Sequence, residues 1–585
     1  MRLSQAGPAA FLVLLRLVAG DSGDGCGAAS SVPDYFQTEP GPFAGPTKTG
    51  AHPFLAHTNA VGYDLPSYVP NRPLHTTVPI LGQSRDDSSI FRRMGNLSPY
   101  SPCPSGFGVE EYSLPEGANI SQVHLLHRHG SRYPTVNSGT RAWAEKILAN
   151  ADQFSGNLSF LRDWSYLLGD ELLTANGHLE LFESGVLHYF NYGRLYDATK
   201  RLVARTTSQV RMLESAEYFL AGFFGLKWAD KVDLEVIIEH DLFNNSLAGT
   251  KNCPNGNNRT LLPGYAARDI WRGVYLKNAT EQLRKWSGTY NWTTDDTHYA
   301  QTVCTYETVS LGSSPFCTLF TRDEWMGFEY EVDLTYSGTN GFASPTGRAV
   351  GIGYVAEFIA RVENHPVSIH PGLSQVNMTL DTSPSTFPTN QSLYLDFSHD
   401  TTIVSILTAF GLRQFAQELS PTSLKADREL RISHIVPFAG RLAIEIITAP
   451  APVAEKRRSR DSKAVYDLAL PQNETRYVHF ILNQRTLPLG RSFEPCGQRD
   501  DGWCELGTFL EIQKKGIKRA QYESSCFGEY AAPGYGDVKD GVPLAADGKW
   551  KGDGEEEGVQ GVQGVQGVQG VQGVQGSNGQ IPMNL

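Results

Sequence analysis

The chain has 585 residues, of which 40% are hydrophobic and 19% charged, so there is ample apolar material for a folded core and the body is not intrinsically disordered. Its 62 acidic residues outnumber the 50 lysines and arginines, which gives a formal net charge of −12. This acidic balance argues against a nucleic-acid-binding protein and against adhesion to an anionic membrane surface.

The first 20 residues have the features of a secretory signal peptide. Arg2 supplies a positive start, an apolar stretch runs from Phe11 to Ala19, and small residues around Gly20 form a cleavage site. Arg16 interrupts the apolar stretch, and the alternative is a frayed cytosolic N-terminus. The chain contains no later run of 18 apolar residues and ends in no hydrophobic tail, so we expect neither a membrane span nor a lipid anchor.

Sequons and cysteines point to the same export route. Ten Asn-x-Ser/Thr sequons predict a surface with N-linked glycans: Asn96, Asn119, Asn157, Asn244, Asn258, Asn278, Asn291, Asn377, Asn390 and Asn473. The even number of cysteines favours disulfides in an exported chain: Cys26, Cys103, Cys253, Cys304, Cys317, Cys496, Cys504 and Cys526. No Cys-x-x-Cys or Cys/His zinc spacing appears, so a structural metal is disfavoured. We expect a secreted protein, extracellular or in the cell wall.

Composition divides the rest of the chain into three parts. Residues 21–92 are rich in Pro, Gly and Thr and are expected to form an irregular arm on the body. Residues 93–534 form the folded region, with helical patterning that predicts a helical insertion at about 150–290. Residues 535–585 are expected to be a disordered tail, because six Gly-Val-Gln units without proline do not form a collagen triple helix.

The first informative element is a strand followed by a charged turn. Val123 and Leu125 alternate with polar neighbours and predict a buried strand, and Thr140 to Leu148 predicts a helix. Between them lies the turn Arg128-His129-Gly130-Ser131-Arg132-Tyr133-Pro134. Two arginines therefore flank a histidine at the carboxyl end of a strand, where open α/β sheets bind ligands.

Two further strand-to-helix junctions carry charge. Leu202 to Ala204 predicts a strand that leads into Arg205, beside the N-terminus of a helix over 208–224. A helix N-terminus favours anions, so Arg205 is a candidate anion ligand. Later, the strand Leu393 to Phe397 leads into His399 and Asp400, and the helix that follows ends at Gly411.

These side chains together suit phosphoryl transfer. Three arginines, Arg128, Arg132 and Arg205, offer planar forks for phosphate oxygens. A neutral histidine nitrogen can attack phosphorus, and an aspartic acid can protonate the leaving oxygen.

Each of these residues could instead have a purely structural role. The arginines could be surface ion-pair partners, and His399 and Asp400 a structural hydrogen-bonded pair. His124, His127 and His129 could form a metal cluster, but strand alternation places His124 on the opposite face.

The turn at 128–134 matches the RHGxRxP signature of the histidine acid phosphatases (histidine phosphatase superfamily, branch 2), and His399-Asp400 matches the HD pair that is their second signature. The chain resembles the fungal secreted acid phosphatases and phytases over most of its length, including the arm PDYFQTEPGPFAGPTKTGAHPFLAHTN and the segment CTYETVSLGSSPFCTLFTRDEW. The paired motif in this order is specific, whereas RHG alone would be a weak signal.

The resemblance implies a histidine phosphatase fold (phosphoglycerate mutase-like), an α/β domain with a mostly helical second domain and the site between them. His129 would be the nucleophile that forms a phosphohistidine, and Asp400 the proton donor. The phosphate ligands would be Arg128, Arg132, Arg205 and His399. The resemblance also implies three disulfides, Cys253–Cys526, Cys304–Cys317 and Cys496–Cys504, and leaves Cys26 and Cys103 over.

The expected activity is hydrolysis of phosphomonoesters, with phytate as one candidate substrate, without cofactor or metal and at an acidic optimum where His129 is neutral and Asp400 protonated. The rim departs from the phytase pattern, because Ser138, Arg141, Thr335 and Tyr336 stand where lysines are usual. This less basic rim should attract a hexakisphosphate more weakly. The alternatives are a phosphomutase of the same superfamily and a non-catalytic cell-wall protein.

Overall fold

The structure is a computed structural model that describes residues 90–103, 105–369, 371–457 and 466–544. The expected signal peptide, nearly all of the arm, Cys26 and the Gly-Val-Gln repeats lie outside these residues. In the part that is described, no helix combines the length and the apolar character needed to cross a bilayer.

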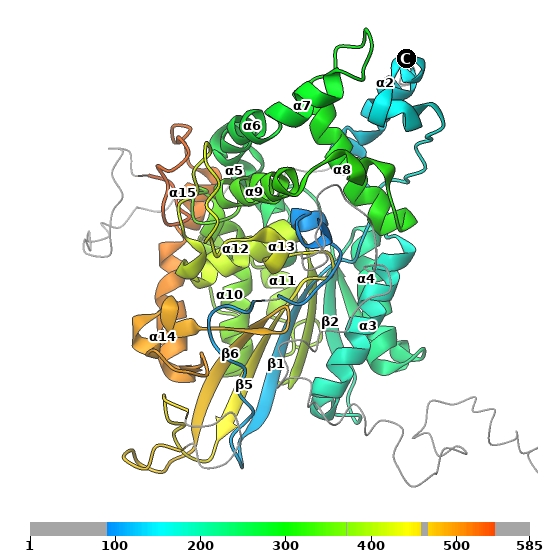
Figure 1. Ribbon diagram of the computed structural model, residues 1–585. Helices are drawn as coiled ribbons and strands as arrows, with labels where there is room; N and C mark the ends of the chain where they lie inside the picture. The colour runs from blue at the N-terminus through cyan, green and yellow to red at the C-terminus, as the bar shows by residue number, and fades with distance from the viewer. Residues whose placement is uncertain (1–89, 104, 370, 458–465, 545–585) are drawn as a thin grey trace, which may run out of the picture. The chain divides into compact units, whose positions relative to one another are not determined.

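One mixed sheet forms the centre of the described chain (Figure 1). Its strand order is β3-β2-β4-β1-β5-β6-β7, and β8 pairs with β6. The first four strands in this order are parallel, and β5 to β8 add an antiparallel half. The strands are β1 Asn119–Arg128, β2 Leu202–Thr207, β3 Val232–Ile237, β4 Leu393–Ser398, β5 Arg441–Ala449, β6 Thr475–Leu482, β7 Arg485–Leu487 and β8 Cys504–Glu505.

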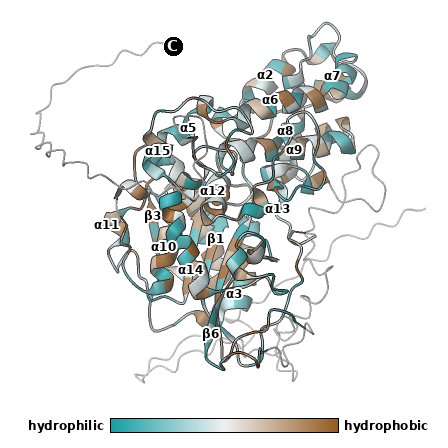
Figure 2. Cartoon of the chain, turned by 90° about the vertical axis from the view of Figure 1, so that its left-hand side faces the viewer, coloured by the Kyte–Doolittle hydropathy of each residue, from teal (hydrophilic) through white to brown (hydrophobic). Residues whose placement is uncertain are grey.

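Helices cover both faces of the sheet. On one face α3 (Ala175–Tyr192) and α4 (Val210–Phe224) pack on Val123 and Leu125 of β1. On the other face α10 (Gly347–Glu363), α12 (Asp400–Phe410) and α14 (Leu506–Arg519) pack in one core with Leu126 of β1. Successive strand residues point to opposite faces, so β1 supplies apolar side chains to both cores. Hydrophobic and hydrophilic residues alternate around these helices (Figure 2).

A second, helical part has its own apolar core. It is built from α2 (Thr140–Leu148), α7 (Lys277–Arg284), α8 (Thr294–Leu311) and the first half of α9 (Arg322–Thr339), whereas the buried residues of α6 (Gly264–Tyr275) lie in the core that contains Leu126. Helices α8 and α9 both begin with a capping box, in which Thr293 and Thr321 cap the first turn. The remaining short helices are α5 Pro254–Asn257, α11 Met378–Asp381, α13 Ile432–Ile435 and α15 Tyr522–Phe527.

The helical insertion expected at about 150–290 is therefore only partly helical. Residues 175–237 supply α3, β2, α4 and β3 to the sheet layer, whereas the helical part combines 140–162 with 254–339. Strand β2 includes the predicted strand residues Leu202 to Ala204 and continues to Thr207, whereas β3, which also has six residues, was not predicted. The helix expected over Thr140–Leu148 has those bounds in the structure.

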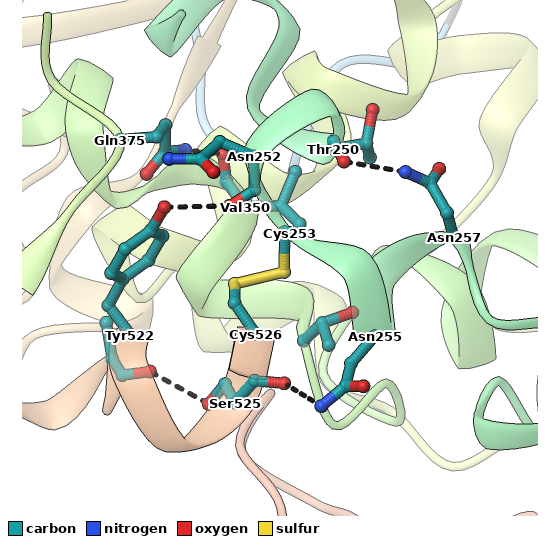
Figure 3. The surroundings of a disulfide bond; sticks show 12 residues. Thr250, Asn252, Cys253, Asn255, Asn257, Val350, Gln375, Tyr522, Ser525 and Cys526 are labelled. Atoms are coloured by element: carbon teal, nitrogen blue, oxygen red, sulfur yellow. Dashed lines mark hydrogen bonds between the residues drawn. A yellow bond between two sulfur atoms is a disulfide. The ribbon is translucent and has the colours of Figure 1, made fainter. Parts of the chain in front are cut away.

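The three disulfides implied by the resemblance are confirmed. Cys253–Cys526 joins α5 to α15 across 273 residues (Figure 3). Beside it, Tyr522 donates to the carbonyl of Asn252 at 2.8 Å, so side-chain hydrogen bonds and the covalent bond hold the same two segments. Cys304–Cys317 and Cys496–Cys504 are local. Cys103 is buried and has no disulfide within the described chain.

The packed body continues past Gly534, where the sequence predicted the start of the tail. Val538 and Val542 are buried, and so is Asp540, whose carboxylate accepts hydrogen bonds from Arg348 at 2.8 Å and Arg519 at 2.7 Å. Residues 535–544 therefore belong to the fold, because two guanidinium groups and apolar contacts anchor them.

Candidate active site

The two sequence motifs meet at the carboxyl edge of the parallel strands. Strands β1 and β4 are neighbours, and their last residues, Arg128 and Ser398, are level in the register. The residues that follow, His129 and His399, therefore lie side by side, with ring centroids 5.8 Å apart. The structure thus brings together the two segments that the resemblance assigns to one site.

The turn after β1 is held in place by close packing against α3. A Cβ on Gly130 would lie 2.3 Å from the carbonyl oxygen of Gly177, so only glycine allows this approach. The backbone N–H of Ser131 donates to the buried carboxylate of Glu180 at 2.7 Å. These contacts fix the backbone on both sides of His129.

His129 is a neutral imidazole with one free nitrogen. Its ring is buried, and Nδ1 lies 2.9 Å from the carbonyl oxygen of Gly130, which can only accept, so Nδ1 carries the proton. Burial holds the pKa of His129 well below its usual range, and the nearby charges of Arg128, Arg211 and Arg132 lower the pKa further. Nε2 therefore keeps its lone pair in acidic solution.

Arg128 and Arg132 converge beside this ring. Arg128 is fully buried and donates to the carbonyl of Val436 at 2.7 Å and to Oδ2 of Asp400 at 2.5 Å. Arg132 is 9% exposed and donates to the carbonyl of Tyr133 at 2.9 Å. The Nε–H of each guanidinium is buried and has no partner among the described residues. Such unused donors suit a phosphate oxygen.

Arg205, the third expected phosphate ligand, lies elsewhere. It is the fourth residue of β2, and its guanidinium donates to Asp396 at 2.8 Å and to Glu357 at 2.6 Å. Asp381 lies 3.6 Å from its third nitrogen. Strand β2 runs to Thr207, three residues beyond the predicted end, so Arg205 is inside the strand and its charge is met by buried carboxylates. The assignment of Arg205 to the phosphate site is wrong.

Arg211 takes that place. It is the second residue of α4, and its charge is among those that lower the pKa of His129. It pairs with the carboxylate of Glu171, a residue with left-handed backbone (φ 64°) that also accepts from the N–H of Val136 at 2.9 Å. The Nε–H of Arg211 is buried and has no partner in the described chain. The sequence could have indicated Arg211 as a candidate anion ligand, since the predicted helix over 208–224 places this arginine in its first turn.

His399 and Asp400 lie where the HD motif predicts, but Asp400 is not protonated. Its Oδ2 accepts from Arg128 and from the amide of Asn96 at 2.9 Å, and its Oδ1 from the N–H of Thr401 at 2.8 Å. Burial alone raises the pKa of Asp400, but Arg128 and the Asn96 hydrogen bond outweigh burial and lower the pKa below its usual range. These partners favour the carboxylate form of Asp400 over the protonated form that a proton donor needs.

The contact of Asn96 with Asp400 also bears on the predicted glycans. The side-chain nitrogen that a glycan would modify is the atom that donates to Asp400, and Ser98 in the same sequon is fully buried. This sequon therefore belongs to the site. Seven of the other sequon asparagines are exposed: Asn119, Asn157, Asn258, Asn278, Asn291, Asn390 and Asn473.

The histidines of β1 do not form a metal cluster. His124 stacks on Tyr394 with centroids 4.7 Å apart, whereas His127 faces Ser184 at 2.8 Å on the other side of the sheet. Elsewhere in the described residues, no group of three His, Cys, Asp or Glu side chains is arranged to hold a metal.

The rim of the site is mostly uncharged. Tyr336 is buried, and its pKa is raised well above its usual range by burial and by the Asp400 carboxylate to which its hydroxyl is hydrogen-bonded. Arg141 is exposed and pairs with Asp170 at 2.6 Å. No lysine stands at positions 138, 141, 335 or 336, so the positive charge is concentrated around His129 rather than at the rim.

Comparison with known proteins shows which family this chain belongs to. The family described as histidine phosphatase superfamily (branch 2) matches residues 119–483. Phytase A of Aspergillus oryzae is 31% identical over 444 residues, which cover 72% of this chain and 88% of that protein. A thiamine-repressible acid phosphatase of Schizosaccharomyces pombe is 31% identical, covering 68% of this chain and 82% of that protein. The crystal structure of a phytase from D. castellii has the same fold, with a TM-score of 0.61 at 23% identity, covering 78% of this chain and 92% of that one. On these matches, the chain belongs to the histidine phosphatase superfamily (branch 2).

Proposed function

We propose that this protein is an exported phosphomonoester hydrolase that passes the phosphoryl group from its substrate to His129 and then to water. Histidine acid phosphatases and phytases of this family are phosphomonoester hydrolases, and the fungal relatives carry those activities in their names. The observation that carries the proposal is the neutral Nε2 of His129 among three arginines with unused donors.

In the first step, the arginines bind the equatorial phosphoryl oxygens, and Nε2 of His129 attacks phosphorus in line with the ester oxygen. The N–P bond forms as the P–O ester bond breaks, and the leaving oxygen takes a proton from Asp400. In the second step, water attacks the phosphohistidine, Asp400 accepts a proton from it, and phosphate leaves. His399 and Arg211 complete the ring of donors.

Substrate binding should favour protonation of the Asp400 carboxylate. A phosphate held by the Nε–H of Arg128 places negative charge beside Asp400 and offsets the guanidinium charge that Asp400 pairs with. Both effects raise the pKa of Asp400 in the complex. Protonation of the carboxyl group in the complex is easiest in acidic solution, which supports the expected acidic optimum.

The rim supports activity on many small phosphomonoesters rather than on one. No lysine stands at the rim positions that could attract the outer phosphates of phytate, so phytate gains little binding energy over a substrate with a single phosphate. Export is supported by the signal-like N-terminus and by three disulfides in the described chain.

The variant His129→Ala tests the proposal. We expect its turnover of p-nitrophenyl phosphate to fall by about 10⁴-fold or more, because no other group can form the phosphoenzyme. Rapid quench with wild-type protein should trap an alkali-stable phosphohistidine. His178→Ala, which changes a half-buried histidine paired with Glu214, is the matched control and should keep its activity. Undiminished turnover by His129→Ala would refute the proposal.

A further inference from the structure

The carboxylate of Glu239 connects three parts of the site and takes no part in the two chemical steps. Glu239 follows β3 by two residues, and its side chain is 3% exposed. Its Oε1 lies 2.7 Å from Nε2 of His399. Neither the RHGxRxP motif nor the HD pair contains it, and no sequence pattern singled it out.

The same carboxylate binds the loop that leads into α4. Thr207 donates its hydroxyl to Oε1, and Gln209 donates its amide to Oε2 at 2.6 Å. The backbone N–H of Glu239 donates to the hydroxyl of Ser208 at 2.9 Å. Since α4 begins at Val210, this loop sets the position of Arg211.

The ionisation state of Glu239 suits it to accept these hydrogen bonds. Burial alone raises the pKa of Glu239, but the charge and hydrogen bond of His399 and the hydrogen bond of Thr207 outweigh burial and lower the pKa, so Glu239 stays ionised in acid. A carboxylate can only accept, so Nε2 of His399 must carry a proton.

We propose that Glu239 is a positioning residue for the phosphoryl group, which acts by orienting His399 and by fixing the loop that presents Arg211. The inference rests on the proposed function, because it assumes that His399 and Arg211 hold phosphate. Glu239 itself touches neither the substrate nor the reacting atoms.

The test compares wild type with Glu239→Gln in kcat and KM for p-nitrophenyl phosphate and in Ki for inorganic phosphate. The amide has the same shape, and Gln209 can accommodate it by turning its own amide, whose buried oxygen has no partner in the described chain. We expect kcat/KM to fall and the phosphate Ki to rise by about 10- to 100-fold. Glu235→Gln, the same change on β3 away from the pocket, should leave both constants within twofold.

A double-mutant cycle with His399→Asn separates positioning from a merely structural role. If Glu239 acts through His399, the fold decrease in kcat/KM caused by Glu239→Gln should be at least about fivefold smaller in the His399→Asn background than in the wild type. Equal losses in both backgrounds, accompanied by a lower melting temperature, would overturn the proposal, as would constants for Glu239→Gln within twofold of wild type.

Two further outcomes are distinguishable. If wild-type protein neither hydrolyses p-nitrophenyl phosphate nor binds phosphate, the proposed function fails; if it does both and Glu239→Gln matches it, only the role of Glu239 fails. Should Glu239→Gln not fold, Thr207→Val removes one of the loop contacts and keeps the carboxylate. It should raise the phosphate Ki at least about threefold, and an unchanged Ki would count against the proposal.

Discussion

Two groups of buried arginines lie along the same parallel strands and differ in how their charge is met. In the inner cluster, Arg205 and Arg361 share the carboxylates of Asp396, Glu357, Asp381 and Glu235. In the strand-end cluster, Arg128, Arg132 and Arg211 lie near the carboxylates of Asp400, Glu171 and Glu239.

The inner cluster has four carboxyl groups for two guanidinium groups, whereas the strand-end cluster has three of each and His399 in addition. Arginines that are outnumbered by carboxyl groups attract an anion less than arginines in a cluster without that excess. The contrast supports the proposal that phosphate binds to arginines at or beyond the strand ends and not to Arg205 within its strand. Arg205 lies within β2, where the neighbouring strand β4 and helix α10 supply the carboxylates that pair with its guanidinium.

The inner cluster should show the greatest loss of stability on mutation. Arg205→Ala leaves Glu357 buried without its cation and Asp396 paired with Arg361 alone, and we expect a loss of about 3–5 kcal/mol in the free energy of unfolding. Denaturant unfolding at neutral pH measures this loss. The protein that remains folded should keep its kcat/KM within a few fold. A loss of activity at unchanged stability would place Arg205 in the phosphate site after all.

The reverse pattern is expected at the strand-end cluster. Arg211→Ala should lower kcat/KM for p-nitrophenyl phosphate by about 10²- to 10³-fold, because a preset donor to the phosphoryl oxygens is lost. Its free energy of unfolding should change by no more than about 1 kcal/mol, since Glu171 is 39% exposed and can be solvated. Arg141→Ala, on the exposed rim, is the matched control. If Arg211→Ala behaved like this control, the proposed three-arginine site would be wrong.

The local motifs could be predicted from sequence, and the contacts between distant segments could not. The turn at 128–134 and the pair His399-Asp400 each contain their charged and polar residues within a few consecutive positions. Their place at the ends of strands could therefore be predicted from the local pattern. Arg205 was expected beside the helix N-terminus because the predicted strand ended three residues early, whereas the observed strand β2 includes Arg205.

The protonation state of Asp400 and the antiparallel half of the sheet depend on distant residues. Asn96 and Arg128 reach Asp400 from 304 and 272 residues away, and no local pattern encodes those contacts. Strands β5 to β8 follow the HD motif, and their antiparallel pairing joins segments that no local sequence pattern connects. Glu239 was missed for a related reason, since it acts only through groups from two other segments.

Asp400→Asn tests the role of the carboxyl group in the strand-end cluster. The amide cannot donate a proton to a leaving alkoxide as an acid does, so kcat for glycerol phosphate should fall by about 10²-fold or more. The loss for p-nitrophenyl phosphate, which has a good leaving group, should be at least about tenfold smaller. The variant also frees Arg128 from its carboxylate, so the Ki for inorganic phosphate should decrease. Equal losses for both esters would contradict the proton-donor role.

The weakest effect should be a pH dependence of stability that arises in the inner cluster. Burial raises the pKa of Glu235 to about 7, and neither of its carboxylate oxygens has a hydrogen-bond partner among the described residues. The folded state therefore keeps a proton that the unfolded chain loses above its ordinary pKa of 4.5. Stability from this group is fully present below that value and is lost as the pH rises to about 7. The pKa of Asp381 is raised in the same direction, by burial and by Glu357.

We expect the melting temperature of the wild type to fall between pH 5 and pH 8, by the equivalent of about 1–2 kcal/mol for Glu235 alone. Glu235→Gln should reduce this slope, because the amide is neutral at every pH, whereas Glu281→Gln on the exposed face of α7 should leave it unchanged. Thermal unfolding across that range measures the slopes. A wild type that became more stable toward pH 8 would mean that the excess carboxyl groups of the inner cluster are all ionised, and the contrast with the strand-end cluster would then lie in geometry rather than in charge.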